Sequence, residues 1–280
     1  MLIQFNSIRK INFQKQNTKE NKALCKSCSK MQQTDLNKLR DNRYLINFKG
    51  GNALVIDKMQ TMVKSKNYTP QELRKLYESL SETAKQNFNG ILGKFKSEGL
   101  DFETLLPCAV IANLFYCKPD TVAKNVQDLV KKFEKEGLNT GDYVKACIKQ
   151  PPLFCLSPKT IEEHIRAYMY VDKNKQGYSN HKIMGEILKK NLAYSTSLIY
   201  LQGIILPQLK EQCLEMSKWT TSGIKPKLKE YFEKNPEKNF TIKILNDEMS
   251  GNFVKVIKEY CQKDFGRNDM FNIVVIHSIS

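Results

Sequence analysis

The stretch that decides the fold occurs twice: residues 113–122 read NLFYCKPDTV, and residues 152–161 read PLFCLSPKTI. The two copies lie 39 residues apart. At this spacing, like residues pair at several positions within the stretch and on either side of it: Cys108 with Cys147, Leu114 with Leu153, Phe115 with Phe154, Pro119 with Pro158, Thr121 with Thr160 and Val126 with Ile165. A repeat of this length is usually one helical unit, which stacks on its neighbours because it cannot bury its apolar face alone.

The pairing continues on both sides of these copies. Upstream, residues 94–100 (KFKSEGL) match residues 132–138 (KFEKEGL), and downstream Ile187 and Leu192 fall on Ile148 and Leu153. The sequence therefore predicts a mainly α protein, with an α-solenoid of about four two-helix repeats of period about 39 over residues 64–207. Its outer units are degenerate, as expected for units that face water on one side.

Each unit is predicted to contain two helices. In the clearer copy the first helix covers residues 140–150 and carries an apolar stripe, which Pro151 and Pro152 end. The second helix begins with Ser157 as its cap and Pro158 in its first turn. In the sister copy we expect the second helix to end at Gly137, since glycine suits the left-handed residue that closes a helix.

The flanking segments follow other patterns. We predict helices over residues 52–64, from Thr69-Pro70 onward, over 208–219 and over 227–235, then a strand–helix–strand element over 240–244, 252–264 and 270–276. The expected buried residues are Leu54, Val55, Met59 and Met62 in the first helix and Leu209, Cys213 and Met216 in the third. This gives a basic, disordered tail (1–48), a helical repeat domain (49–207) and a C-terminal region with a small α/β cap (208–280).

The net charge of +16 is unevenly distributed. Residues 1–70 hold 14 Lys/Arg and 4 Asp/Glu, whereas residues 71–178 hold 16 and 14. A basic tail attracts phosphates without sequence preference, but the repeats themselves are nearly neutral. No apolar run is long enough for a transmembrane helix, so we expect no membrane association and an intracellular, cytoplasmic protein. The acid-poor start also leaves an organellar targeting segment open.

No catalytic, cofactor or metal site is evident, so we predict neither an enzyme nor a small-molecule substrate. The eight cysteines are scattered, as in a reducing compartment. Cys25 and Cys28 lack a second ligand pair at zinc spacing. No two of His164, His181 and His277 have metal-ligand spacing, and acidic residues beside His164 are explained by a favourable interaction with the helix dipole.

The unit from Gly137-Leu138 through Pro152-Leu153-Phe154 to Ser157-Pro158 resembles the repeat of the mitochondrial transcription termination factor (mTERF) family. Units of that family pair a first helix, a Pro-x-Leu-Leu step and a second helix. The resemblance implies an α-solenoid that binds nucleic acid along a concave basic surface, but it identifies no binding residues here.

Two functions follow as hypotheses. In the first, which we slightly prefer, the repeats bind RNA or DNA, and lysines near the steps between helices contact phosphates. The candidates are Lys118, Lys149, Lys159, Lys189 and Lys190. In the second, the near-neutral repeats form a protein-interaction scaffold that holds a partner helix or peptide.

Overall fold

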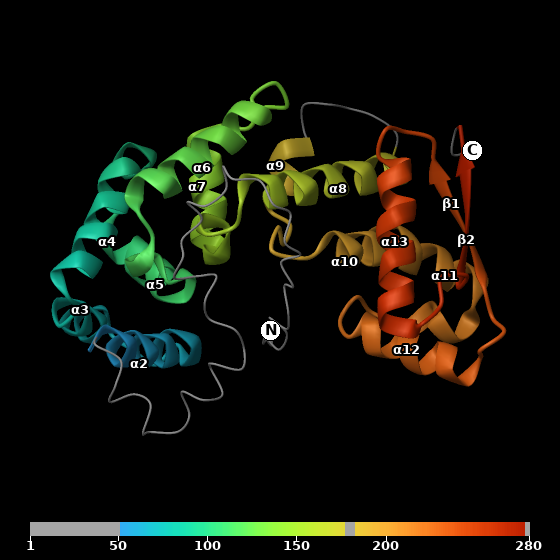
Figure 1. Ribbon diagram of the computed structural model, residues 1–280, viewed down its shortest axis with the longest axis horizontal. Coiled ribbons are helices and arrows are strands. Elements are labelled where there is room, and N and C mark those ends of the chain that lie inside the picture. The colour runs from blue at the N-terminus through green and yellow to red at the C-terminus, as the bar shows by residue number, and fades with distance from the viewer. Residues whose placement is uncertain (1–50, 177–182, 278–280) are drawn as a thin grey trace. The chain divides into compact units, whose positions relative to one another are not determined.

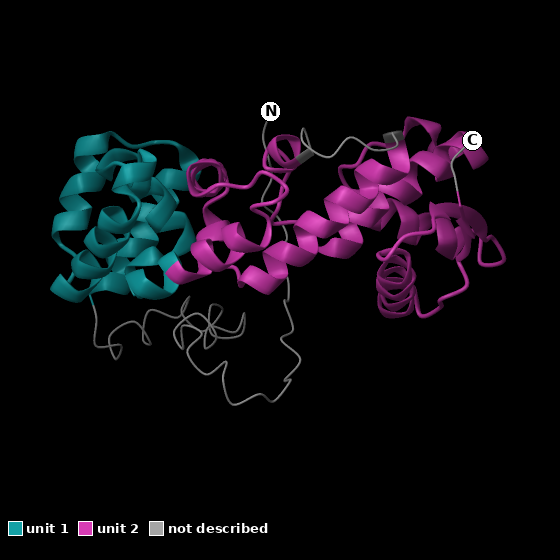
Figure 2. Cartoon of the chain, turned by 90° about the horizontal axis from the view of Figure 1, so that it is seen from above, with its two compact units in different colours: residues 1–123 teal, residues 124–280 magenta. Residues whose placement is uncertain are grey.

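The computed structural model describes residues 51–176 and 183–277 (Figure 1). These residues form a mainly α protein with a small parallel two-stranded sheet near the C-terminus, which confirms the predicted fold class at that level. The chain divides into two compact units, residues 1–123 and 124–280 (Figure 2). The predicted tail, with Cys25 and Cys28, lies outside the described residues, and the three predicted domains stay a prediction. No helix in the described ranges is long and apolar enough to cross a membrane.

The first unit is built from short helices. They are α2 (Asn52–Ser65), α3 (Pro70–Glu78), α4 (Glu82–Lys94), the 3-10 turn η1 (Lys96–Glu98), α5 (Phe102–Ala112), the 3-10 turn η2 (Leu114–Tyr116) and the beginning of α6 (Pro119–Lys132). Side-chain caps fix where several of them begin. Thr69 accepts from the Glu72 N–H at 3.2 Å, and the Glu72 carboxylate accepts from the Thr69 N–H at 2.7 Å. This reciprocal pair starts α3 where the sequence predicted a helix.

Helix α2 buries a face that differs in part from the one predicted. Its buried residues are Ile56, Met59 and Val63, whereas Leu54 is 54% exposed. The spacing of three and four residues between the buried positions keeps them on one side of the helix. Of the four predicted residues, Met59 is buried, Val55 and Met62 are half-buried, and the prediction was wrong for Leu54, which falls outside the buried stripe.

The second unit contains the remainder of the elements. They are α7 (Thr140–Lys149), the 3-10 turn η3 (Pro151–Phe154), α8 (Pro158–Gln176), α9 (Ile183–Ile187), α10 (Thr196–Tyr200), the π-helical turn η4 (Leu201–Ile205), α11 (Leu206–Gln212), the 3-10 turn η5 (Leu214–Lys218), α12 (Ile224–Lys234), β1 (Phe240–Leu245), α13 (Ser250–Phe265) and β2 (Phe271–Ile276). Helix α8 begins at Pro158 as predicted, and the Ser157 hydroxyl accepts from the Thr160 N–H at 3.1 Å.

Two turns, one in each unit, have the same hydrogen bonds. The Leu100 N–H donates to Phe95 C=O at 3.3 Å, and the Leu138 N–H donates to Phe133 C=O at 3.0 Å. Gly99 and Gly137 occupy the left-handed region in these turns, with φ of 82° and 88°. Helix α6 itself ends at Lys132, so the prediction that it runs to Gly137 was wrong. The glycine instead closes the turn that follows the helix.

Helical geometry runs without a break from α10 through η4 into α11, over residues 196–212. The missing Cβ of Gly203 allows this helix to approach α8, since a Cβ there would lie 2.4 Å from Cγ1 of Val171. The predicted helix over 208–219 was wrong after Gln212. Cys213 has extended backbone angles, and its Sγ lies 3.7 Å from the Tyr231 hydroxyl oxygen.

The predicted strand–helix–strand element is present. Strands β1 and β2 pair in parallel, with Phe240 opposite Phe271 and Leu245 opposite Ile276, and helix α13 connects them. Aromatic rings fill the core beside the sheet: the ring centroid of Phe232 lies 5.9 Å from that of Phe240 and 6.0 Å from that of Phe271. Alternate residues of β1 are buried, which is the pattern that predicted the strand.

Candidate nucleic-acid interface

A fixed elbow joins helices α7 and α8 in the second unit. Helix α7 ends because Gln150 leaves helical geometry, with φ of −133° and ψ of 73°, and two prolines follow. The Tyr143 hydroxyl donates to Leu153 C=O at 3.3 Å. Leu153 and Phe154 are buried at the centre of the elbow. The ends of α7 and α8 therefore have a defined separation and direction.

The loop of residues 190–192 is bound against this elbow by three side chains. Gln150 uses both ends of its amide: Nε2 donates to Lys190 C=O at 2.7 Å, and Oε1 accepts from the Leu192 N–H at 2.8 Å. The Tyr168 hydroxyl donates to Asn191 C=O at 3.0 Å, and His164 contacts Leu192 C=O through Nδ1 at 2.7 Å. These bonds hold the chain around Lys189 and Lys190 close to the end of α7.

His164 is a buried structural histidine. It is 7% exposed, and its burial lowers its pKa. A neutral ring with a proton on Nδ1 donates to Leu192 C=O, so the imidazole contributes a hydrogen bond without a buried charge. The neighbouring Glu162 pairs with Lys132 and, at 3.2 Å, with Nε of Arg166. The two ion pairs hold the pKa of Glu162 below its usual value.

The five predicted lysines have different surroundings. Lys149, at the end of α7, and Lys159, in the first turn of α8, are exposed and flank the elbow. No acidic side chain in the described part of the chain lies within ion-pair distance of either. Lys189 pairs with Glu186 at 2.6 Å. Lys190 has its Nζ 2.6 Å from Asp172 Oδ1 and 5.2 Å from the centroid of the Tyr168 ring.

Lys190 is therefore a poor phosphate contact, because its charge is already neutralised in a half-buried position. Lys118 belongs to the first unit, where it is exposed directly before helix α6. Its backbone C=O accepts from the Val122 N–H at 3.1 Å and so begins that helix. The structure thus brings Lys149 close to the segment that carries Lys189 and Lys190, with Lys159 at the other end of the same elbow.

Gln150 is the residue at this site that the sequence did not single out. Gln150 stands between Lys149, the last residue of α7, and the prolines Pro151 and Pro152. At this position its side chain extends beyond the end of the helix. A polar residue directly before a Pro-Pro stop was the available signal, because the freed backbone groups nearby need partners. Its partners, Lys190 and Leu192, lie 40 and 42 residues further along the chain, so no short-range sequence pattern indicates these contacts.

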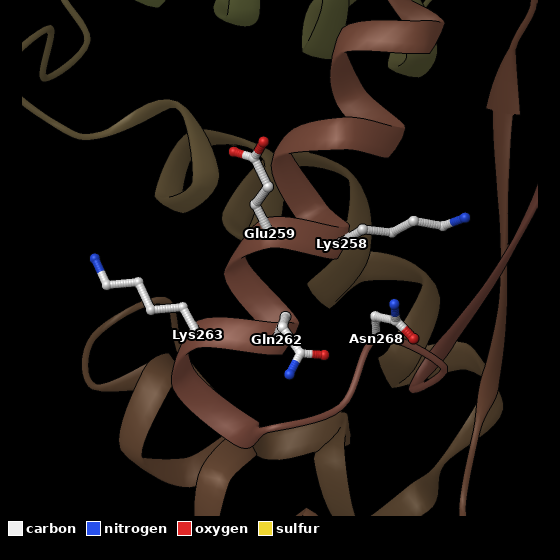
Figure 3. A pocket seen from close by; sticks show the side chains of 5 residues that line it. All are labelled: Lys258, Glu259, Gln262, Lys263 and Asn268. Atoms are coloured by element: carbon white, nitrogen blue, oxygen red, sulfur yellow. The ribbon is translucent and has the colours of Figure 1, made fainter. Parts of the chain in front are cut away.

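A second feature with several polar side chains is a shallow, open depression on helix α13 and the loop after it. It is lined by Lys258, Glu259, Gln262, Lys263 and Asn268. Figure 3 shows these side chains pointing in different directions and away from one another. Because polar groups in a ligand site converge on a common point, this arrangement does not define one.

The described residues also show no metal centre. Nowhere in residues 51–176 and 183–277 do three or more His, Cys, Asp or Glu side chains gather as metal ligands. Cys108 and Cys261 are buried, and burial raises the pKa of the Cys108 thiol to about 11 and that of Cys261 to about 12. Thiols with such values stay protonated near neutral pH and pack as small apolar groups.

No protein-family model, curated protein or solved structure matches this chain. The function is therefore inferred from the residues and geometry described above.

Proposed function

We propose that this chain is a non-catalytic helical-repeat protein that binds RNA or DNA through exposed lysines at the ends of its helices. The observation that carries the proposal is the pair Lys149 and Lys159, both exposed and without an acidic partner among the described residues, on the two sides of a fixed elbow. A rigid element holds charged side chains at a set spacing, so less freedom is lost when they bind a phosphate backbone.

The distribution of charge supports the same function. Residues 124–280 contain 25 Lys/Arg and 18 Asp/Glu, whereas residues 51–123 contain 9 and 8. Residues 1–50 add a further 11 Lys/Arg against 3 Asp/Glu. A polyanion is attracted to such an excess and releases counterions when it binds. In this proposal the second unit and the N-terminal segment supply most of the attraction.

We further propose that the helices form tandem two-helix repeats of the solenoid type. The support is local: α5, η2 and α6 follow one another in the same order as α7, η3 and α8. Asp101 accepts from the Thr104 N–H at 2.7 Å, and Asn139 accepts from the Asp142 N–H at 2.9 Å, so the first helices also share a cap. Stacked units of this kind present the same helix ends along one surface.

The test measures binding of RNA and DNA by the full chain at several salt concentrations. In the double variant Lys149→Gln/Lys159→Gln, the slope of log affinity against log salt should become shallower by about 0.9 per lost duplex phosphate contact, or about 0.7 for a single strand. Lys145→Gln/Lys229→Gln is the matched control, because it removes two positive charges that already face Asp142 and Glu233. Equal slopes in the wild type and the first variant would overturn the proposal.

A protein-interaction scaffold is the second candidate, and the composition of the first unit favours it. Residues 51–123 are nearly neutral, and they expose Leu54 at 54% and Ile111 at 39%. Exposed apolar side chains on a neutral surface suit a protein partner better than a polyanion. Retention of a stoichiometric protein partner after nuclease treatment, together with salt-insensitive capture, would favour this function over nucleic-acid binding.

A further inference from the structure

The two outer edges of the sheet have different surroundings. Strand β1 turns the backbone groups of Thr241, Lys243 and Leu245 away from β2. Helix side chains bond to all three residues. Gln212 Nε2 donates to Thr241 C=O at 2.7 Å, and its Oε1 accepts from the Thr241 N–H at 3.2 Å. Gln208 bonds to the backbone of Lys243 in the same way: its Nε2 donates to the C=O and its Oε1 accepts from the N–H, both at 2.8 Å.

The end of the same edge is closed in the same way. Asn174 Oδ1 accepts from the Leu245 N–H at 2.9 Å, and the Tyr170 hydroxyl donates to Leu245 C=O at 2.9 Å. Every N–H and C=O on the outer side of β1 therefore has a partner. No further strand can add there without breaking these bonds.

The outer edge of strand β2 is open at Val275, which is 46% exposed, whereas Phe271 at its other end is 5% exposed. The Phe240 N–H donates to Met270 C=O, and the Asn246 N–H donates to Ile276 C=O, so even-numbered residues of β2 face β1. Phe271, Ile273 and Val275 turn their backbone groups outward. Within the described residues these groups have no hydrogen-bond partner. Figure 1 draws β1 and β2 side by side, with β2 forming one edge of the pair.

The composition of β2 also differs from that of a protected edge. Its six residues, FNIVVI, include no charge and no proline, and Val274 and Val275 are 37% and 46% exposed. Proteins usually protect such an edge with lysine, proline or a covering element, because an open uncharged strand pairs readily with another. Lys243 stands on β1 instead, whose edge is already covered.

We propose that two copies of the chain associate through β2, which pairs antiparallel with β2 of the second copy. A two-fold axis at Ile273 sets Ile273 opposite itself and Phe271 opposite Val275, so that all the outward N–H and C=O groups of both strands find partners. In this pairing no two like charges lie opposite each other, and the aromatic Phe271 lies opposite the β-branched Val275. Because the outer edge of β1 is occupied, the result is a closed four-stranded dimer and not a filament.

This association is independent of the proposed function and responds oppositely to salt. The net charge of +16 makes two copies repel each other, and salt screens that repulsion. Self-association through β2 should therefore strengthen between about 0.1 M and about 1 M salt, over which range the screening length falls from about 10 Å to about 3 Å. Binding to nucleic acid should weaken over the same range.

Sedimentation equilibrium of the nuclease-treated full chain tests the proposal. A species of twice the 32.4 kDa chain mass should grow with protein concentration and with salt. Val275→Lys places a charge on the open edge, and Ile273→Pro removes an outward N–H while leaving the β1–β2 ladder in place, so both should be monomeric. Leu214→Lys is the matched control, since Leu214 is 88% exposed on a different element, and it should dimerise like the wild type.

Melting curves report whether each variant is folded, and the Val275→Lys variant keeps the test valid if Ile273→Pro does not fold. A wild-type chain that stays monomeric at every concentration and salt would overturn the proposal. So would a dimer that survives Val275→Lys unchanged.

Discussion

Gln208 on helix α11 completes the hydrogen bonding of Lys243 on strand β1, because its amide contacts both the N–H and the C=O of that residue at 2.8 Å. Gln212, one helical turn later, does the same for Thr241, two residues earlier on the strand. Four residues of helix rise about 6 Å, and two residues of strand about 6.6 Å, so the two spacings match. Side chains of α11 thus satisfy the backbone groups of β1 that would otherwise bond to a third strand.

Replacing Gln208 with alanine should lower the free energy of unfolding by about 1 kcal/mol, because two hydrogen bonds to the strand are lost and water replaces them only in part. Urea denaturation measures the change. Gln262→Ala on α13 is the control, since its side chain makes only a 3.4 Å contact with Gly266 C=O, and it should change stability by less than about 0.5 kcal/mol. Equal effects of the two substitutions would contradict the strand-edge role of Gln208.

His164 should make the stability of the chain fall as the pH drops below 6.5, the ordinary value of the histidine pKa. Its pKa is lowered in the folded chain, so the unfolded chain takes up the proton first as the pH falls below the ordinary value of 6.5. Its contribution is fully present above that value and is lost progressively towards the lower folded pKa. Melting temperatures of wild type and His164→Gln across this range measure the effect. The wild type should lose more stability on acidification, and parallel curves would contradict the buried neutral histidine.

Gly203→Ala should destabilise the second unit by about 1–3 kcal/mol, because the new methyl group would overlap Val171 in a packed helix contact. Val171→Ala in the same chain should recover part of that loss, since it removes the overlapping methyl groups. Gly93→Ala is the control: a Cβ there meets no atom within 4 Å, so that variant should be as stable as the wild type or more stable. Denaturation of these three variants and the wild type distinguishes overlap from a general effect of alanine.

Gly99→Ala and Gly137→Ala should each lower the free energy of unfolding by about 1 kcal/mol. The two effects should be similar, because both residues have left-handed backbone angles in turns with the same hydrogen bonds. Chemical denaturation of the two single variants tests this. A large penalty at one position and none at the other would indicate that the two turns differ in their packing, and would weaken the case for tandem repeats.

The sequence predicted those elements whose signals are local. Proline and capping residues marked the beginnings of α3 and α8, and alternation marked β1. It was wrong where side-chain direction or a distant partner decides the outcome. Leu54 is apolar but lies off the buried stripe of α2, and Cys213 leaves the helix to lie beside Tyr231.

The sequence likewise indicated only the local part of the candidate interface. The exposed ends of helices placed Lys149 and Lys159 correctly on the surface. The neutralisation of Lys190 by Asp172, 18 residues earlier, could not be read from local spacing, because it depends on how the loop of residues 190–192 is bound to α8. Gln150 binds the same loop over 40 residues, and no periodicity in the sequence indicates such a contact.

The salt dependence of RNA and DNA binding by residues 49–280 tests the central claim most directly, since this fragment removes most of the basic N-terminal excess and keeps every described residue. If the second unit binds phosphates, the fragment should still bind, with a shallower but non-zero slope of log affinity against log salt. Complete loss of binding in the folded fragment, with binding retained by the full chain, would assign the attraction to the N-terminal segment and contradict a nucleic-acid role for the helices.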